Sequence, residues 1–140
     1  MRFWDSSALV PLLISEPSSE QVRRLLAEDH DIVASIITPI EIQSALWRRR
    51  HHNEMAADQH IIAEEAFARL SESWSEIDDI VEVRQLAMDL ITRHVLRAAD
   101  ALQLGTAIIA SSGAPGSLPF VTLDLDLAAA ARVEGFSVLS

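Results

Sequence analysis

The sequence predicts an α/β protein of three layers, in which a short, mainly parallel central sheet is flanked by helices on both faces. Short apolar segments of strand length alternate with segments of helical periodicity along almost the whole chain. This alternation is typical of parallel sheets covered on both faces. The chain has 140 residues, of which 49% are hydrophobic, and shows no linker or repeat. We therefore expect one domain over residues 1–140 with a substantial core.

Five segments are predicted as strands because they are short and apolar. The segment 2–5 ends in the acid Asp5, and the segment 118–123, which precedes Asp124, is apolar except for Thr122. The five expected strands cover residues 2–5, 31–35, 74–77, 118–123 and 136–139.

Helices are predicted between these strands from the spacing of apolar residues. Thr38, Pro39 and Glu41 form a capping-box pattern at the start of one helix, and Asn53 is expected to cap the next. Gly135 is expected to end an Ala-rich last helix. The preceding helices are expected over residues 6–14, 20–28, 38–50, 54–73, 79–94 and 96–112.

The helix expected at residues 96–112 is apolar on nearly every face, yet it carries Asp100. Such a helix belongs inside a domain, where an uncompensated carboxylate is unfavourable. Asp100 lies in the first turn, so the free N–H groups and the helix dipole could compensate its charge. A bound cation is the other possibility.

Four acids are expected at one edge of the sheet. Asp5 and Asp124 follow strands, while Glu41 and Asp100 lie in the first turns of helices that begin near the same edge. Ligands of parallel sheets bind beyond the carboxyl ends of the strands. Each acid alone could simply stabilise a helix start. Together, four like charges require protons or cations, and carboxylate oxygens suit Mg²⁺ or Mn²⁺.

Hydroxyl groups accompany these acids. Ser6, Ser7 and Thr122 are close to them in sequence and could orient carboxylates or water. Asp126 follows the last of the four acids. Its simplest interpretation is a solvated acid favoured by the helix dipole, and it is kept as a weaker candidate for a supporting residue of the site.

The charge balance restricts the partners. The net charge is −10, and all eleven basic residues are arginine. Such a chain is a poor general nucleic-acid binder but suits bound cations and a basic protein partner. No apolar run is long enough to span a bilayer, no signal peptide is evident, and cysteine is absent. We therefore expect a cytoplasmic protein.

Four segments carry a resemblance to a known family. They are FWDSSALVPLL with Asp5, TPIEIQSAL with Glu41, LRAADALQLGTAI with Asp100, and FVTLDLDLAAAA with Asp124. In this order they resemble the four acidic motifs of the PIN domain, and among PIN proteins the chain is most similar to VapC-type toxins of type II toxin–antitoxin systems.

The resemblance implies a Mg²⁺-dependent endoribonuclease, in which Mn²⁺ could replace Mg²⁺. It implies Asp5 and Asp100 as central metal ligands, with Glu41 and Asp124 completing the site. Thr122 matches a hydroxyl that often precedes the last acid of the family. The family is usually homodimeric and is inhibited by a cognate antitoxin, here expected to be basic and VapB-like. No sequence-specific DNA binding is expected of this chain.

The run Arg48, Arg49 and Arg50 has two interpretations. Cations at a helix end complement the dipole and are usually solvated. The other interpretation is that they contact the RNA backbone beside the acidic edge.

A different class of function stays open: a non-catalytic PIN-like module that acts through protein contacts. The charge of −10 and the lack of a broad basic surface favour it. The presence of all four acids favours the nuclease.

Overall fold

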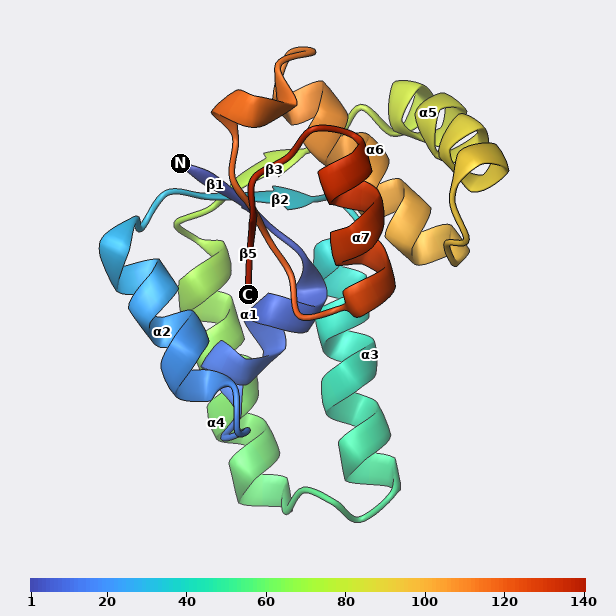
Figure 1. Cartoon of the computed structure of the whole chain (residues 1–140). Coiled ribbons are helices and arrows are strands. Elements are labelled where there is room, and N and C mark those ends of the chain that lie inside the picture. Colours follow the sequence, from blue (N-terminus) through green and yellow to red (C-terminus); the bar gives the residue numbers. More distant parts are fainter.

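The computed structural model describes all 140 residues and contains a five-stranded sheet surrounded by helices (Figure 1). The strand order is β3-β2-β1-β4-β5, and every neighbouring pair is parallel. The strands are β1 (Arg2–Trp4), β2 (Ile32–Ser35), β3 (Ser75–Ile77), β4 (Phe120–Val121) and β5 (Val138–Leu139). The predicted fold class is confirmed, and all the expected strands form, although each is shorter than expected.

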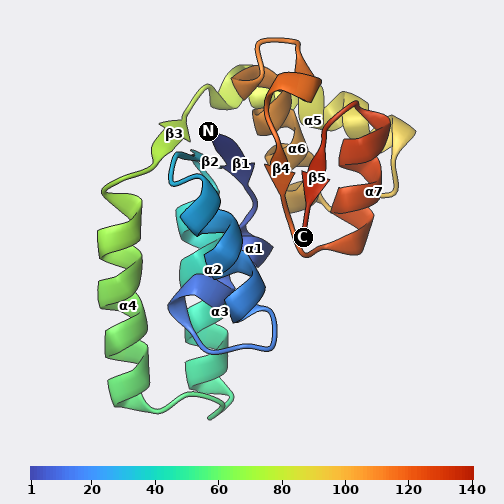
Figure 2. The ribbon, with the colours of Figure 1, turned by 60° about the vertical axis from the view of Figure 1, so that its left-hand side comes forward.

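The helices form one layer on each face of the sheet, as Figure 2 shows. One layer contains α1 (Ser6–Leu13), α2 (Ser19–Glu28), α3 (Thr38–His51) and α4 (Ala57–Ser71). The other contains α5 (Ile80–Arg93), α6 (Ala98–Ala110) and α7 (Leu125–Val133), and a 3-10 turn (Pro115–Ser117) precedes β4. None of these helices combines the length and apolarity needed to cross a membrane.

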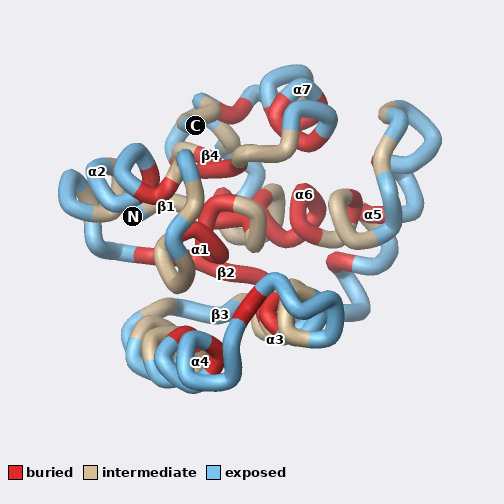
Figure 3. The backbone as a smooth tube through the Cα atoms, turned by 90° about the horizontal axis from the view of Figure 1, so that it is seen from below, coloured by how far each residue is buried: buried red, intermediate tan, exposed pale blue.

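Two apolar clusters fill the space between the layers, because successive strand residues point to opposite faces. Trp4 and Val121 belong to the cluster under α1 to α4, while Phe3 and Phe120 belong to the cluster under α6 and α7. The rings of Phe3 and Phe120 lie 5.0 Å apart between centroids. Figure 3 shows the buried backbone concentrated along the strands and the inner helix α6. The sheet is thus a rigid support whose carboxyl edge is fixed from both sides.

Strand β4 is shorter than the predicted strand at 118–123, and side chains explain where it ends. The N–H of Leu123 donates to Ser7 Oγ at 2.9 Å, and the N–H of Asp124 donates to Thr122 Oγ1 at 3.1 Å. These backbone donors are therefore used by hydroxyl groups instead of a neighbouring strand. The chain leaves the sheet at this point and places Asp124 at the start of α7.

Two predicted helix caps are wrong. Thr38 is the first residue of α3, not its cap, and its Oγ1 accepts a hydrogen bond from the Ser35 N–H at 3.2 Å. Asn53 has a φ of 57° and lies in the turn after α3, whereas α4 begins only at Ala57. Asparagine tolerates this left-handed conformation, which ends helices. The predicted end of the last helix at Gly135, with a φ of 97°, is confirmed.

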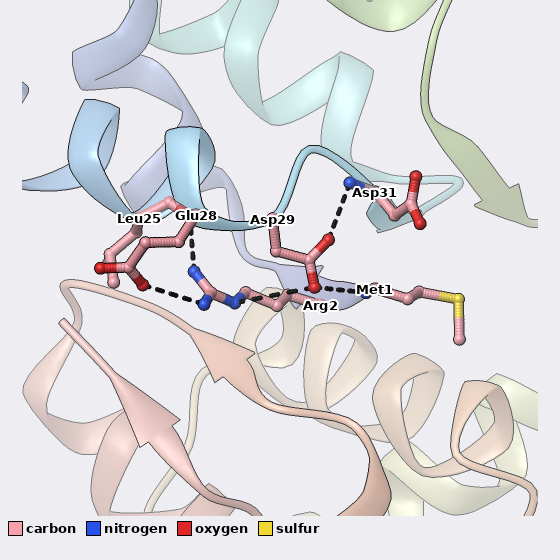
Figure 4. A network of polar contacts seen from close by, with 6 residues as sticks. All are labelled: Met1, Arg2, Leu25, Glu28, Asp29 and Asp31. Atoms are coloured by element: carbon pink, nitrogen blue, oxygen red, sulfur yellow. Dashed lines mark hydrogen bonds and ion pairs between the residues drawn. The ribbon is translucent and has the colours of Figure 1, made fainter.

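The start of β1 is tied to the end of α2 by charged groups (Figure 4). Arg2 Nη2 lies 3.0 Å from Glu28 Oε2, and the N-terminal amino group of Met1 contacts Asp29. Hydrogen bonds from this amino group and from the Asp31 N–H lower the pKa of Asp29 below its usual value. These contacts fix the beginning of the strand whose other end carries Asp5.

Helices α5 and α6 pack closely at Gly105, which is buried in the middle of α6. A Cβ atom at this position would lie 3.2 Å from the Val83 carbonyl oxygen and 3.5 Å from the Ala87 nitrogen. We therefore expect Gly105→Leu to lower the free energy of unfolding by about 1–3 kcal/mol, measured by urea denaturation. The exposed Ala129→Leu on α7 is the control, and an equal loss there would contradict the packing argument.

Candidate functional site

The four predicted acids converge at the carboxyl edge of the sheet. Asp5 directly follows β1, and Asp124 follows the neighbouring strand β4. Glu41 and Asp100 lie in the first turns of α3 and α6. The acids are close enough to influence one another, because the charge of Asp100 raises the pKa of both Asp5 and Glu41, and that of Asp124 raises the pKa of Asp100.

Asp5 is the most buried of these acids, with 3% of its surface exposed. Burial raises its pKa, and hydrogen bonds from Ser7 and Thr122 offset part of this effect. All of these bonds reach one oxygen: Oδ2 accepts from the Ser7 N–H at 3.2 Å, from the Ser7 hydroxyl, and from Thr122 Oγ1 at 3.0 Å. The other oxygen, Oδ1, has only the Ser6 hydroxyl at 3.5 Å. Asp5 is thus both the cap of α1 and a carboxylate with one free oxygen.

Ser7 has a larger part in the site than the sequence indicates. Its hydroxyl accepts from the Leu123 N–H, contacts Thr122 Oγ1 at 3.2 Å and donates to Asp5. It therefore joins the ends of β1 and β4, whereas Ser6 makes a long contact to Asp5 at 3.5 Å and lowers the pKa of Glu41. A capping Asp accepts from the backbone two or three residues later, so the position of Ser7 after Asp5 was a usable signal.

Glu41 does not form the predicted capping box, since Thr38 is engaged elsewhere. Its Oε2 instead accepts from Gln103 Nε2. Burial raises the pKa of Glu41, the Gln103 hydrogen bond opposes this shift, and the charges of Asp5 and Asp100 add to it.

Gln103 is a fully buried residue that the sequence interpretation missed. The available signal was its spacing, because Asp100, Gln103 and Thr106 are three residues apart on an otherwise apolar helix. Residues at this spacing share one face of a helix. That face of α6 is turned toward Thr38 and Glu41 of α3.

Asp100 and Asp124 are both held by helix starts. Asp100 Oδ2 accepts from the Arg97 N–H at 3.2 Å, and Asp124 Oδ1 accepts from the Leu127 N–H at 2.8 Å. Burial raises the pKa of Asp100; the Arg97 N–H opposes this shift, and the charges of Asp124 and Asp126 add to it. Asp126 itself is exposed and acts on the site only through its charge.

The four carboxylates share one arrangement: protein donors hold one oxygen, and the second has no protein donor or only the hydroxyl of Ser6. Oxygen donors of this kind suit Mg²⁺ or Mn²⁺, and a bound cation would relieve the mutual repulsion that adds to burial in raising the pKa values of Asp5, Glu41 and Asp100. The donor chemistry therefore fits a divalent ion. As the side chains stand, no three acidic or histidine groups are arranged to hold one ion together.

A groove of about 500 Å³ extends from Glu41 between α1 and α3. Ser6, Ser7 and Glu41 line it at the acidic end, and Arg48 and Arg49 line it at the other. It joins the acidic edge to the arginine run that the sequence singled out.

The three arginines of this run differ in their contacts. Arg49 forms an ion pair with Glu16, and Arg50 donates to the carbonyl of Met55 at 3.5 Å without lining the groove. Arg48 is exposed and its guanidinium makes no hydrogen bond or ion pair. Of the three predicted contacts, Arg48 is the one whose charge is available in the groove.

Fold and site together define a three-layer α/β protein with acidic side chains gathered at the carboxyl edge of a parallel sheet. The model of the PIN domain matches residues 2–133, and the chain belongs to the PIN domain family. No curated protein matches the sequence significantly.

Solved structures share the fold at low sequence identity. FitAcB from Neisseria gonorrhoeae is 18% identical with a TM-score of 0.70, and the match covers 100% of this chain and 97% of that one. A toxin–antitoxin complex from Klebsiella pneumoniae is 17% identical with a TM-score of 0.67 over 100% and 97% of the chains. PAE2754 from Pyrobaculum aerophilum is 20% identical with a TM-score of 0.63 over 92% and 83%.

Proposed function

We propose that the chain is a Mg²⁺-dependent endoribonuclease toxin of VapC type, from a type II toxin–antitoxin module. The observation that carries this proposal is the convergence of four carboxylates, each with one oxygen held and one available. Membership of the PIN family supports a nuclease. The fold shared with a toxin–antitoxin complex from Klebsiella pneumoniae supports the type of module.

Asp5 and Asp100 would hold the ion, with Glu41 and Asp124 completing the site. Mg²⁺ or Mn²⁺ would supply the positive charge that binds the scissile phosphate and lowers the pKa of water. Ser7 and Thr122 hold the Asp5 carboxylate by Oδ2, so its orientation is set before any ligand arrives. Such preorganisation avoids rearranging charged groups during the reaction.

The direct test is cleavage of single-stranded RNA by the purified chain without antitoxin. We expect cleavage with Mg²⁺ or Mn²⁺, none with EDTA, and products with a 5′ phosphate and a 3′ hydroxyl. Persistence of the same cleavage in both Asp5→Asn and Asp100→Asn would refute this assignment.

Arg48 is proposed to bind the RNA backbone in the groove beside Glu41. We expect Arg48→Ala to raise KM with little change in kcat, because the contact is to a phosphate remote from the reaction. The slope of log affinity against log salt concentration should fall by about 0.7, the value for one contact to a single strand. Arg50→Ala is the comparison, since Arg50 does not line the groove; an equal change there would contradict the role of Arg48.

The proposed partner is a basic, VapB-like antitoxin that inserts an arginine among the four carboxylates. Bidentate pairing of arginine with a carboxylate is strong, and the net charge of −10 favours a basic partner. A structure of the complex in which Asp5 and Asp100 remain open to solvent would contradict this mode of inhibition. The free chain is proposed to be a homodimer, which analytical ultracentrifugation would test.

A non-catalytic PIN-like module is the second candidate. The spacing of the acids favours this candidate, because no three acidic or histidine side chains are arranged, as they stand, to hold one ion together. Calorimetric titration separates the two candidates, because only the nuclease requires binding of Mn²⁺ or Mg²⁺ at millimolar concentration.

A further inference from the structure

We propose that Gln103 is the positioning residue of the site: its side-chain amide holds the Glu41 carboxylate in place beside Asp5 and Asp100. Only the expected consequence of this inference, a change in the affinity for a divalent ion, rests on the proposed function. The arrangement of the two side chains is independent of that function and can be tested in the metal-free protein.

Glu41 depends on a side chain in a way that the other three acids do not. Asp5, Asp100 and Asp124 each accept a hydrogen bond from a backbone N–H, which is fixed by the start of a helix. Glu41 accepts none from the backbone. The one hydrogen bond to its carboxylate comes from the Gln103 amide, and a weaker interaction with the Ser6 hydroxyl lowers its pKa. A long, flexible glutamate without the Gln103 donor could turn toward solvent.

The Gln103 side chain is itself held in one orientation. It is fully buried, and Nε2 donates to Thr38 Oγ1 at 3.0 Å as well as to Glu41 Oε2. An ionised carboxylate can only accept hydrogen bonds, so the amide nitrogen must face Glu41. Thr38 Oγ1 in turn accepts from the Ser35 N–H, which anchors the arrangement to the end of β2.

Helix α6 thereby couples two acids of the site. Asp100 and Gln103 lie on one face of this helix, one turn apart. Asp100 contributes its own carboxylate, while Gln103 fixes a carboxylate of α3. The buried packing of α6 therefore sets the separation of Asp100 and Glu41 through one rigid element.

The test compares Gln103→Met with Thr106→Val by calorimetry with Mn²⁺. Methionine has a similar length and no donor, whereas Thr106 is equally buried on α6 but its hydroxyl forms hydrogen bonds only with Ser35 and the Leu102 carbonyl. We expect Gln103→Met to weaken Mn²⁺ binding by about 10- to 100-fold, the usual effect of losing a partner that orients a ligand. Thr106→Val should leave the affinity within about threefold of the wild type, well below that loss.

A variant cycle with Glu41→Gln separates positioning from general destabilisation. In the Glu41→Gln background, Gln103→Met should cause no further loss of Mn²⁺ affinity, because the carboxylate that it positions is already gone. A full additional loss in that background, or equal losses from Gln103→Met and Thr106→Val, would overturn the inference. Unchanged affinity in Gln103→Met would overturn it as well.

Two further measurements keep the inference testable when other arms fail. If the wild type binds no divalent ion and cleaves no RNA, the proposed function fails, and metal-free crystal structures decide the inference: displacement of Glu41 in Gln103→Met supports it, and an unmoved carboxylate overturns it. If Gln103→Met does not fold, the side-chain amide resonances of Gln103 decide. They should shift in Glu41→Ala, and unchanged resonances would overturn the inference.

Discussion

Asp5→Asn is expected to abolish metal-dependent RNA cleavage, lowering kcat by at least about 10²–10³-fold, the effect of removing one preorganised electrostatic group. The amide oxygen of asparagine can still accept from the Ser7 N–H and the Thr122 hydroxyl, as Asp5 Oδ2 does. The variant loses the negative charge and the available carboxylate oxygen, so ion binding should be lost while the fold remains. Cleavage assays with Mg²⁺ and circular dichroism measure these two results.

Asp79→Asn is the matched control for this prediction. Asp79 also caps a helix through its side chain, accepting from the Glu82 N–H at 3.4 Å, but it lies at the start of α5. We expect full activity from this variant. Comparable loss of cleavage in both variants would mean that capping, and not ion binding, explains the effect at Asp5.

Asp100→Asn is expected to make the metal-free protein at least as stable as the wild type at neutral pH, with a rise in Tm of up to a few degrees. Burial and the charges of Asp124 and Asp126 raise the pKa of Asp100 in the folded state, while the Arg97 N–H opposes them. The ionised carboxylate is therefore a net cost to folding, which a neutral asparagine removes. A large loss of metal-free stability would instead favour helix stabilisation as the main role of Asp100.

The pH dependence of stability follows from the same shifts. The pKa values of Asp5, Glu41 and Asp100 are raised in the folded state, so this state takes up their protons first as the pH falls. This preferential proton uptake stabilises the folded state. The stabilisation is complete below the pKa values of the unfolded chain, about 4, and is lost as the pH rises through the raised pKa values of the folded state. Asp29, whose pKa is lowered, acts in the opposite direction and loses its contribution as the pH falls below about 4.

Denaturation of the metal-free chain between pH 8 and pH 4 tests this trend. The wild type should gain stability as the pH is lowered through the raised folded pKa values, and Asp100→Asn should show a smaller gain. Saturating Mg²⁺ should reverse the trend, because the ion binds the ionised carboxylates and competes with protons. Parallel pH profiles of the wild type and Asp100→Asn would contradict the assignment of the shift to Asp100.

The fold could be predicted from the sequence because a strand that is buried on both faces appears in the sequence as a short apolar segment. The positions of Asp5, Glu41, Asp100 and Asp124 at one edge could be predicted for a related reason: residues after parallel strands and at the starts of the following helices meet at the carboxyl edge. Their roles as metal ligands remain predictions.

The contacts of individual side chains could not be predicted. The pattern at Thr38 satisfied every rule for a helix cap, yet its hydroxyl bonds Ser35 and Gln103, which come from other elements. Asn53 likewise ends one helix although its sequence position suits the start of the next. Local rules cannot distinguish these uses, because a hydroxyl or amide takes whichever donor or acceptor the tertiary fold brings to it.

The position of β1 between β2 and β4 in the sheet determines at which stage of synthesis the site can form. Asp5 is synthesised well before its hydrogen-bond partner Thr122, which lies 117 positions later. Pairing of distant parallel strands is slow because a long loop must close first. A nascent chain therefore lacks a complete site until β4 and Asp124 have also been synthesised. The four acids can meet only after the chain from β1 to the start of α7 has emerged.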